Sequence, residues 1–241
     1  IGISPTLSAR LGPDTTLTAS YTYDNDARTV DRGVPSLNGL PLAGFDETFF
    51  GDRDYNYGTV EAHIARARLE HRFSDNWSVN AALQYADYDK FYANLVPDSA
   101  TATTVRLSGY ENANDRRTLI GQVNLVGQLE TGSIGHTLLL GAEVTSSDSS
   151  SSRDQARFSN GTSATVTVAL EDVIAVPAFT LRPQRSNTAE LSTFSAYAQE
   201  QLDLGGKIPP HLVIELREQP RIRIDRIEVV DVQPAHREAS D

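Results

Sequence analysis

Apolar and polar residues alternate with a period of two in several segments, which is the pattern of a β-strand with two different faces. In Leu17–Tyr23 the odd positions are apolar and the even positions are polar. The same alternation occurs in Trp77–Tyr85, Leu119–Leu129 and Thr193–Leu202. Helical periodicity does not extend over any comparable length. The pattern predicts an all-β chain of about eight antiparallel strands in up-and-down order.

The connections between these strands alternate between short and long. Residues typical of tight turns occur at Gly12–Asp14, Ser74–Asn76, Gly132–Gly135 and Gly205–Lys207. Long polar segments lie at approximately Asp31–Asn56, Asn94–Arg106 and Ser149–Asn187. We expect the serine-rich run Ser146–Ser152 to begin an exposed, mobile loop. Tight turns at one end of a sheet and long loops at the other indicate an outer-membrane β-barrel.

The face opposite the apolar residues carries charge. Arg66, Arg68 and Arg72 share one side of a predicted strand, and the other side carries Ala65 and Ala67. A cation at the lipid mid-plane costs about 2–4 kcal/mol, so these arginines must face water or a polar protein surface. A soluble sheet with a solvated face remains an alternative. Small alanines would form a poor soluble core, however, so we expect the apolar side to be the convex, lipid-facing one.

Composition narrows the possible classes of protein. The chain of 241 residues is 39% hydrophobic and has no apolar stretch of the roughly 20 residues that a membrane-spanning helix needs. Its formal net charge of −11 argues against a nucleic-acid partner, which requires clustered Lys and Arg. No cysteine is present, so disulfides and thiolate metal sites are excluded. Methionine is also absent, even at position 1, and we expect the natural N-terminus to lie upstream.

An ordered series of segments resembles the early barrel of TonB-dependent siderophore receptors, closest to the catecholate-type branch. The series comprises Asp31–Gly39, Phe49–Asp52, Leu69–Trp77, Tyr85–Tyr92 and, later, Ala196–Leu202. The resemblance covers approximately residues 1–205. The prolines Pro209, Pro210 and Pro220 interrupt the strand pattern that the family would continue, so 207–241 is an atypical tail.

The resemblance implies a fold, a location and partners. Such receptors are 22-stranded barrels in the bacterial outer membrane, closed by an N-terminal plug domain, and they import ferric siderophores with energy from the TonB complex. Residues 1–241 then form the N-terminal part of the barrel, about eight strands, without the plug. We therefore expect this segment alone to be inactive. The implied partners are a ferric siderophore, the TonB complex through the missing N-terminal region, and outer-membrane lipid and lipopolysaccharide.

Candidate binding residues follow from what a siderophore needs. The chelator already wraps its iron, so we expect no cofactor and no protein ligands to the metal. Aromatic rings and cations suit its aryl groups and negative charge. Tyr88, Lys90 and Tyr92 share the parity of the polar positions Asn80 and Gln84, which points them inward. The first long loop adds Arg32, Phe49, Phe50, Arg53, Tyr55 and Tyr57. The deeper Arg66, Arg68 and Arg72 are assigned to the plug.

Other classes of function remain as alternatives. The five histidines lie at spacings that match no metal site, and no serine lies in a nucleophile motif, so no catalytic residue is expected. A passive porin or autotransporter barrel would need no plug. A soluble β-rich binding module and an outer-membrane hydrolase whose Ser and His meet only in space complete the alternatives.

Overall fold

A computed structural model describes residues 1–203, 213–217 and 221–231, the last two ranges as backbone only. Its strands are β1 (Gly2–Ile3), β2 (Thr6–Arg10), β3 (Thr15–Thr29), β4 (Ser36–Leu37), β5 (Leu40–Pro41), β6 (Tyr57–Arg72), β7 (Trp77–Ala100), β8 (Thr104–Thr131), β9 (Ile134–Arg157), β10 (Thr165–Ala169), β11 (Thr180–Asp203), β12 (Val213–Arg217) and β13 (Arg221–Asp231). No helix long and apolar enough to cross a membrane occurs among the described residues.

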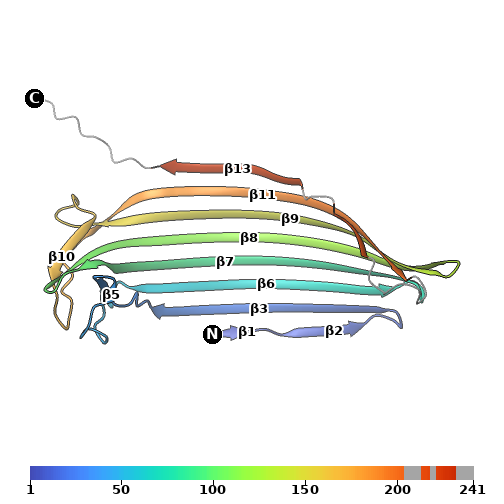
Figure 1. Cartoon of the computed structure of the whole chain (residues 1–241), viewed down its shortest axis with the longest axis horizontal. Helices are drawn as coiled ribbons and strands as arrows, with labels where there is room; N and C mark the ends of the chain where they lie inside the picture. Colours follow the sequence, from blue (N-terminus) through green and yellow to red (C-terminus); the bar gives the residue numbers. More distant parts are fainter. Residues whose placement is uncertain (204–212, 218–220, 232–241) are drawn as a thin grey trace, which may run out of the picture.

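The long strands form one curved antiparallel sheet in sequential order (Figure 1). The order is β1-β3-β6-β7-β8-β9-β11-β12. The short β2 pairs with β3 beside β1, and β13 pairs with β11 beside β12, so these four strands fill only the two outermost positions. The sheet therefore has eight strand positions, which confirms the predicted all-β, up-and-down architecture of part of a barrel.

The two ends of the sheet differ, as the turn chemistry predicts. At one end, here called the turn end, short connections at 11–14, 73–76 and 132–133 join consecutive strands. Gly132 has a φ of 65°, as the first central position of a type II′ hairpin turn requires. At the other end, the loop end, lie residues 30–56 with the β4–β5 hairpin and residues 158–179 with β10 (Figure 1). The predicted turn at Gly205–Lys207 falls outside the described residues.

Two of the predicted loops are wrong. Segment Asn94–Arg106 is almost entirely strand, because β7 and β8 continue to a turn at 101–103. The serine-rich run Ser146–Ser152 lies inside β9, where most of its residues are half-buried. Its side chains hydrogen-bond to the neighbouring strand β8. Ser150 donates to Asp115 at 2.9 Å and Ser151 to Asn114 at 2.8 Å. Pairing on both sides therefore orders a sequence whose composition suggests mobility.

The sheet separates apolar from polar residues, as predicted. Residues directly opposite each other on antiparallel strands share a face. One row joins Leu17, Leu69, Ala81, Val123 and Ala142, and the next carries Leu83, Val144 and Phe194. Most of these large side chains stay exposed, Leu83 at 52% and Phe194 at 56%. The opposite rows carry Arg66, Gln84, Gln122 and Glu143. We call these surfaces the apolar face and the polar face.

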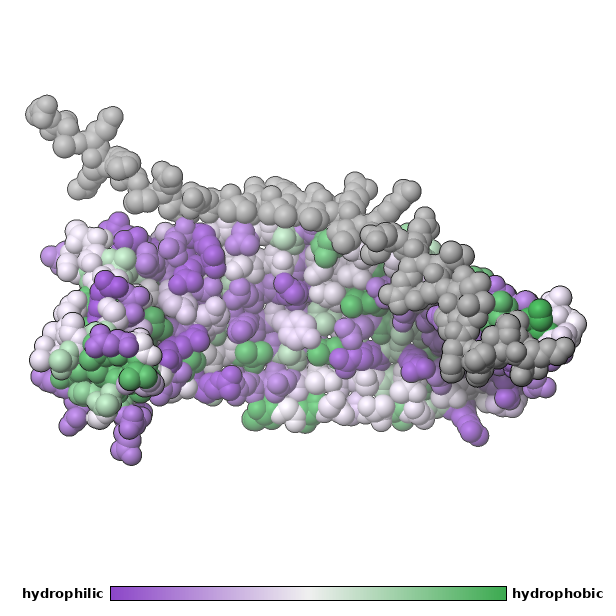
Figure 2. Space-filling view, in the orientation of Figure 1, coloured by the Kyte–Doolittle hydropathy of each residue, from purple (hydrophilic) through white to green (hydrophobic). Residues whose placement is uncertain are grey.

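Among the residues whose side chains the structure describes, a small hydrophobic core packs at the loop end. Leu42 and Phe50 from the first loop contact Val105 and Leu107 of β8 and Ile174 of the last loop. A second cluster joins Leu95, Ala156 and Phe158. Figure 2 shows hydrophobic residues among hydrophilic ones at this end, where β5 and β10 lie. This packing fixes the loops against the strand ends, and so it positions the side chains that follow.

Candidate ligand-binding site on the polar face

The predicted inward set lies on the polar face. Pairing of β6 with β7 shows no register shift from Tyr57 to Arg72, so the parity of Asn80 and Gln84 extends to Tyr88, Lys90 and Tyr92. The Tyr92 ring is the centre of a group of contacts. Arg32 lies over this ring with its guanidinium carbon 5.7 Å from the centroid, and the ammonium nitrogen of Lys90 lies 5.5 Å away. The structure thus brings Arg32 from the first loop to the predicted strand residues.

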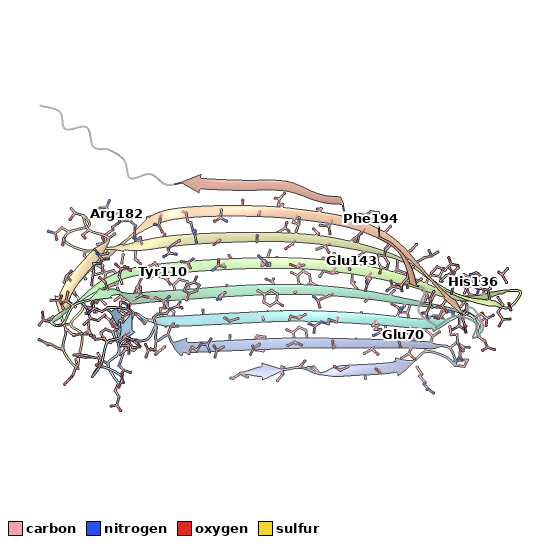
Figure 3. All side chains as sticks on the ribbon, in the orientation of Figure 1. Glu70, Tyr110, His136, Glu143, Arg182 and Phe194 are labelled. Carbon is pink, nitrogen blue, oxygen red and sulfur yellow. The ribbon has the colours of Figure 1, made fainter. Side chains whose placement is uncertain are left out.

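Sequence reasoning missed two members of this group. Tyr110 of β8 meets Tyr92 edge-on with ring centroids 6.0 Å apart, and the guanidinium carbon of Arg153 lies 3.9 Å from the Tyr110 centroid. Both residues fall in or beside segments that were predicted as loops. The signal that identifies them is the alternation Tyr110, Asn112, Asn114, Arg116 on β8, read in register with Tyr92 and Tyr88 on β7. Figure 3 shows Tyr110 toward the loop end of the sheet.

Buried amides surround the two tyrosines. Asn94 and Asn112 are 0% and 4% exposed, and Arg32 donates from Nε to the Asn94 Oδ1 at 2.9 Å. Three buried polar atoms in this group have no hydrogen-bond partner among the described residues. These are Nδ2 of Asn94, Oδ1 of Asn112 and Nε of Arg153. An unpartnered buried polar group costs about 1–3 kcal/mol, so such a group is usually explained by function or by a bound molecule.

A buried asparagine holds the first loop against this region. The Asn56 side chain is 1% exposed and pairs with the backbone of Leu95 in both directions, since Nδ2 donates to the Leu95 carbonyl and Oδ1 accepts from its amide, each at 2.9 Å. Asn56 Nδ2 also donates to the carbonyl of Val30 at 3.2 Å. One side chain therefore ties the beginning and the end of the loop to β7, and this places Arg32 beside Tyr92.

The other predicted loop residues lie elsewhere. Phe50 is 2% exposed within the loop-end core, so its ring is closed off from a ligand in this conformation. Tyr55 packs edge-on against Phe179 with ring centroids 4.8 Å apart. The Tyr57 ring contacts Phe91 at 5.2 Å on the apolar face. Phe49 and Arg53 form a separate cation–π pair at 4.9 Å. Sequence proximity groups these residues, whereas strand parity and loop packing separate them.

One carboxyl group beneath the loop-end core has an altered acidity. Burial raises the pKa of Glu111 above its ordinary value, and the Asp154 carboxylate, directly opposite on β9, raises it further. Burial is also the main reason that the pKa of the neighbouring Tyr55 hydroxyl is raised, with Glu111 adding to the effect. Glu111 and Asp154 have the parity of the apolar face, so this group belongs to loop packing and lies apart from the tyrosine pair.

The arginines nearer the turn end are each held by a neighbour on the polar face. Arg66 donates to Gln84 at 2.7 Å, Arg68 pairs with Glu70 at 2.7 Å, and Arg72 pairs with Asp14 at 2.7 Å. All three side chains are exposed on this surface. Within the part of the chain that the structure describes, no three His, Asp or Glu side chains are grouped as metal ligands.

Residues 3–223 match the family described as TonB dependent receptor-like, beta-barrel. The chain therefore belongs to the TonB-dependent receptor barrels, a family of receptors and transporters of the bacterial outer membrane. In such a barrel the apolar face contacts lipid and the polar face lines the interior.

The curated relatives that the chain matches include siderophore receptors. The chain is 27% identical over 154 residues to the probable TonB-dependent siderophore receptor PiuA of Acinetobacter baumannii, which is 59% of this chain and 21% of that protein. It is 30% identical over 120 residues to the ferrioxamine B receptor of Salmonella typhimurium, covering 45% of this chain and 17% of that protein. The chain thus spans about one fifth of the length of the curated relatives it matches.

Solved structures share the fold. The crystal structure of PiuA from Acinetobacter baumannii superposes with a TM-score of 0.69 at 23% identity, over 84% of this chain and 32% of that one. The open form of the ferric-catecholate import receptor Fiu from E. coli K12 gives a TM-score of 0.67 at 18% identity, over 95% of this chain and 42% of that one. At these identities the likeness establishes the fold alone.

Proposed function

We propose that this chain is part of an outer-membrane receptor that imports a ferric siderophore with energy delivered through TonB. The observation that carries the proposal is the aromatic and cationic group on the interior face at the loop end, centred on Tyr92 and Tyr110. Family membership and the names of the relatives support it. The iron arrives inside its chelate, so the protein supplies rings, amides and cations and no metal ligands.

The rest of the receptor completes this function. Residues 1–241 form the N-terminal part of the barrel, with 207–241 as an atypical tail, and the plug domain and TonB contact lie outside this segment. Arg66, Arg68 and Arg72 project from the interior face below the tyrosines, where they meet the plug. The apolar face contacts membrane lipid and, on the extracellular side, lipopolysaccharide.

Replacing Tyr88 and Tyr92 with alanine in the full-length receptor tests the proposal. Aromatic contacts contribute about 0.5–1.5 kcal/mol each beyond area burial, so the double variant should bind its ferric siderophore roughly tenfold more weakly or worse. Equilibrium binding to purified receptor measures this effect, and iron-limited growth gives a second readout. Tyr57→Ala is the matched control, because Tyr57 lies at the same end of the sheet on the opposite face. Unchanged affinity in the double variant contradicts a ligand-binding role for these rings.

A further inference from the structure

The loop-end part of the sheet separates charge by face. From Tyr88 to Asn94 on β7, and at the partner positions on β8, β9 and β11, every ionic side chain on the polar face is a cation. These are Lys90, Arg116, Arg153, Arg182 and Arg185. They come from four strands and lie in four successive rows, so the register alone brings them onto one surface. Figure 3 shows Arg182 on β11 at the same end of the sheet as Tyr110 on β8.

At the loop end, beyond the rows of exposed apolar residues, the apolar face of the same strands is negatively charged. It carries Asp87, Asp89, Glu111, Asp115, Asp148, Asp154 and Glu190. Arg117 is the cation among them, and its Nε lies 3.3 Å from the Asp87 carboxylate. The polar face of β7 to β11 is therefore cationic although the whole chain is acidic, and most neighbouring carboxylates lie on the other side of the sheet. On the polar face of β3, two strands from β7, Asp24 and Asp26 share the rows of Tyr88 and Lys90, and Asp26 pairs with Arg28 at 3.3 Å.

Four of these five cations lack an ionic partner among the residues whose side chains the structure describes. Lys90 and Arg153 contact the rings of Tyr92 and Tyr110, and no described carboxylate pairs with Arg116 or Arg182. Arg185 differs, because Asp231 of β13 lies directly opposite it in the strand pairing. Like charges gathered on one surface repel one another, which opposes folding unless something offsets the repulsion. In a cleft with low-dielectric walls such a surface also concentrates anions.

We infer that the receptor selects a net-negative ferric chelate, and that Arg116 on β8 and Arg153 on β9 determine this selectivity together with Lys90. The cations match the charge of iron held by catecholate or carboxylate groups, and the tyrosines contact its aryl or alkyl surface. A neutral chelate gains nothing from the cations and must displace their water. This inference rests on the proposed function, since it names the substrate class of the same site.

The sequence neighbours Arg116 and Arg117 provide a matched experiment. Both side chains are exposed on β8, one on the cationic interior face and the other on the acidic outer face. In the full-length receptor, Lys90→Gln/Arg116→Gln should weaken binding of an iron(III) tris-catecholate complex about tenfold. Arg117→Gln should leave it unchanged. Arg116→Lys, which keeps the charge, should retain most of the affinity.

Two further arms separate charge selection from general damage. A neutral iron(III) trihydroxamate complex of similar size should bind the wild-type receptor more weakly than the tris-catecholate, and the double variant should reduce that difference. Affinity for the anionic complex should also fall as ionic strength rises, because salt screens exposed charges over about 10 Å at 0.1 M.

The outcomes distinguish this inference from the function on which it rests. Equal loss of both complexes in the double variant, or tighter binding of the neutral one to the wild type, overturns charge selection and leaves siderophore binding intact. Binding of neither complex to the folded wild-type receptor overturns both. Loss of the anionic complex alone in the double variant, with Arg117→Gln unchanged, establishes the selectivity.

Discussion

The two ends of the polar face differ in whether their charged and polar side chains have hydrogen-bond or ion-pair partners. Nearer the turn end, Arg66, Arg68 and Arg72 each meet a carboxylate or an amide within hydrogen-bond distance, and Tyr197 joins an amide network across three strands. Gln122 donates to the Tyr197 hydroxyl at 3.0 Å, this hydroxyl donates to Asn124, and Asn124 donates to Asn80 at 2.9 Å. At the loop end, Lys90 and Arg153 contact rings, Arg116 and Arg182 meet no described carboxylate, and buried atoms of two asparagines and Arg153 lack a described partner. Arg28 and Arg106 are exceptions, since they pair with Asp26 and Asp98.

This difference distinguishes residues that maintain the fold from residues that are available to bind a ligand. Polar groups that satisfy one another hold a surface in place and leave little to offer a ligand. Groups left unsatisfied cost stability in the free protein, and a ligand that pairs with them recovers this cost. We therefore expect changes at the turn end to alter folding or plug contact, and changes at the loop end to alter binding.

Gly141→Ala should give the largest effect on folding. Gly141 lies directly opposite Tyr197, and an added Cβ would lie 2.1 Å from a ring carbon of Tyr197, so the ring and its amide network must move. We expect a loss of about 1–3 kcal/mol in the free energy of unfolding, measured by urea titration of the full-length receptor in detergent micelles. Affinity for the siderophore should not change. Gly12→Ala is the control, since its Cβ would meet nothing within 4 Å. Equal stability of the two variants contradicts the structural role of this pair.

Reversing the charge of Arg66 and Arg68 should have an intermediate effect, which is a weaker contact between the plug and the barrel and therefore a passive leak. Both arginines are exposed on the interior face where we place the plug. Exposed charge contacts are worth about 0–1 kcal/mol each, so Arg66→Glu/Arg68→Glu should raise passive entry of a large antibiotic up to about thirtyfold. Susceptibility assays on cells that express the full-length receptor measure this leak. Arg106→Gln, at the far tip of the sheet, should not alter it. If the double variant leaks no more antibiotic than the wild type, these arginines do not contribute to the plug contact.

The smallest effect concerns pH and loop packing at Glu111. Its pKa is raised in the packed state, so that state binds the proton more tightly than an open loop does. Packing should therefore be firmer below the raised pKa and weaken as the pH rises through it, because Glu111 must then ionise where it is partly buried. Hydrogen-exchange protection of residues 52–57, corrected for intrinsic rates, should therefore fall as the pH is raised through this pKa. Glu111→Gln should remove this fall. A pH dependence that persists in the variant assigns it to other groups.

The sequence predicted the middle of the sheet better than its loop end, for a physical reason. Strands that contact lipid on one face must alternate, so Leu17–Tyr23 and Leu119–Leu129 were recognisable. Beyond the lipid both faces meet water or protein, and the alternation disappears. The loop-end parts of β7, β8 and β9 therefore resembled loops in sequence, although they are strands. Tyr110 and Arg153 were missed with them.

The sequence by itself determined the class of fold, the tight turns, and the inward parity of Tyr88, Lys90 and Tyr92, because side-chain direction in a strand has a fixed period of two. Only the tertiary structure decided which of the other aromatic and basic residues join them. Arg32 reaches Tyr92 because Asn56 fastens the loop, and Phe50 does not because the loop-end core encloses it. The opposite charges of the two faces likewise depend on strand register, which places residues far apart in the sequence side by side, such as Tyr88 with Arg116 and Arg153 with Arg185, and which no local pattern encodes.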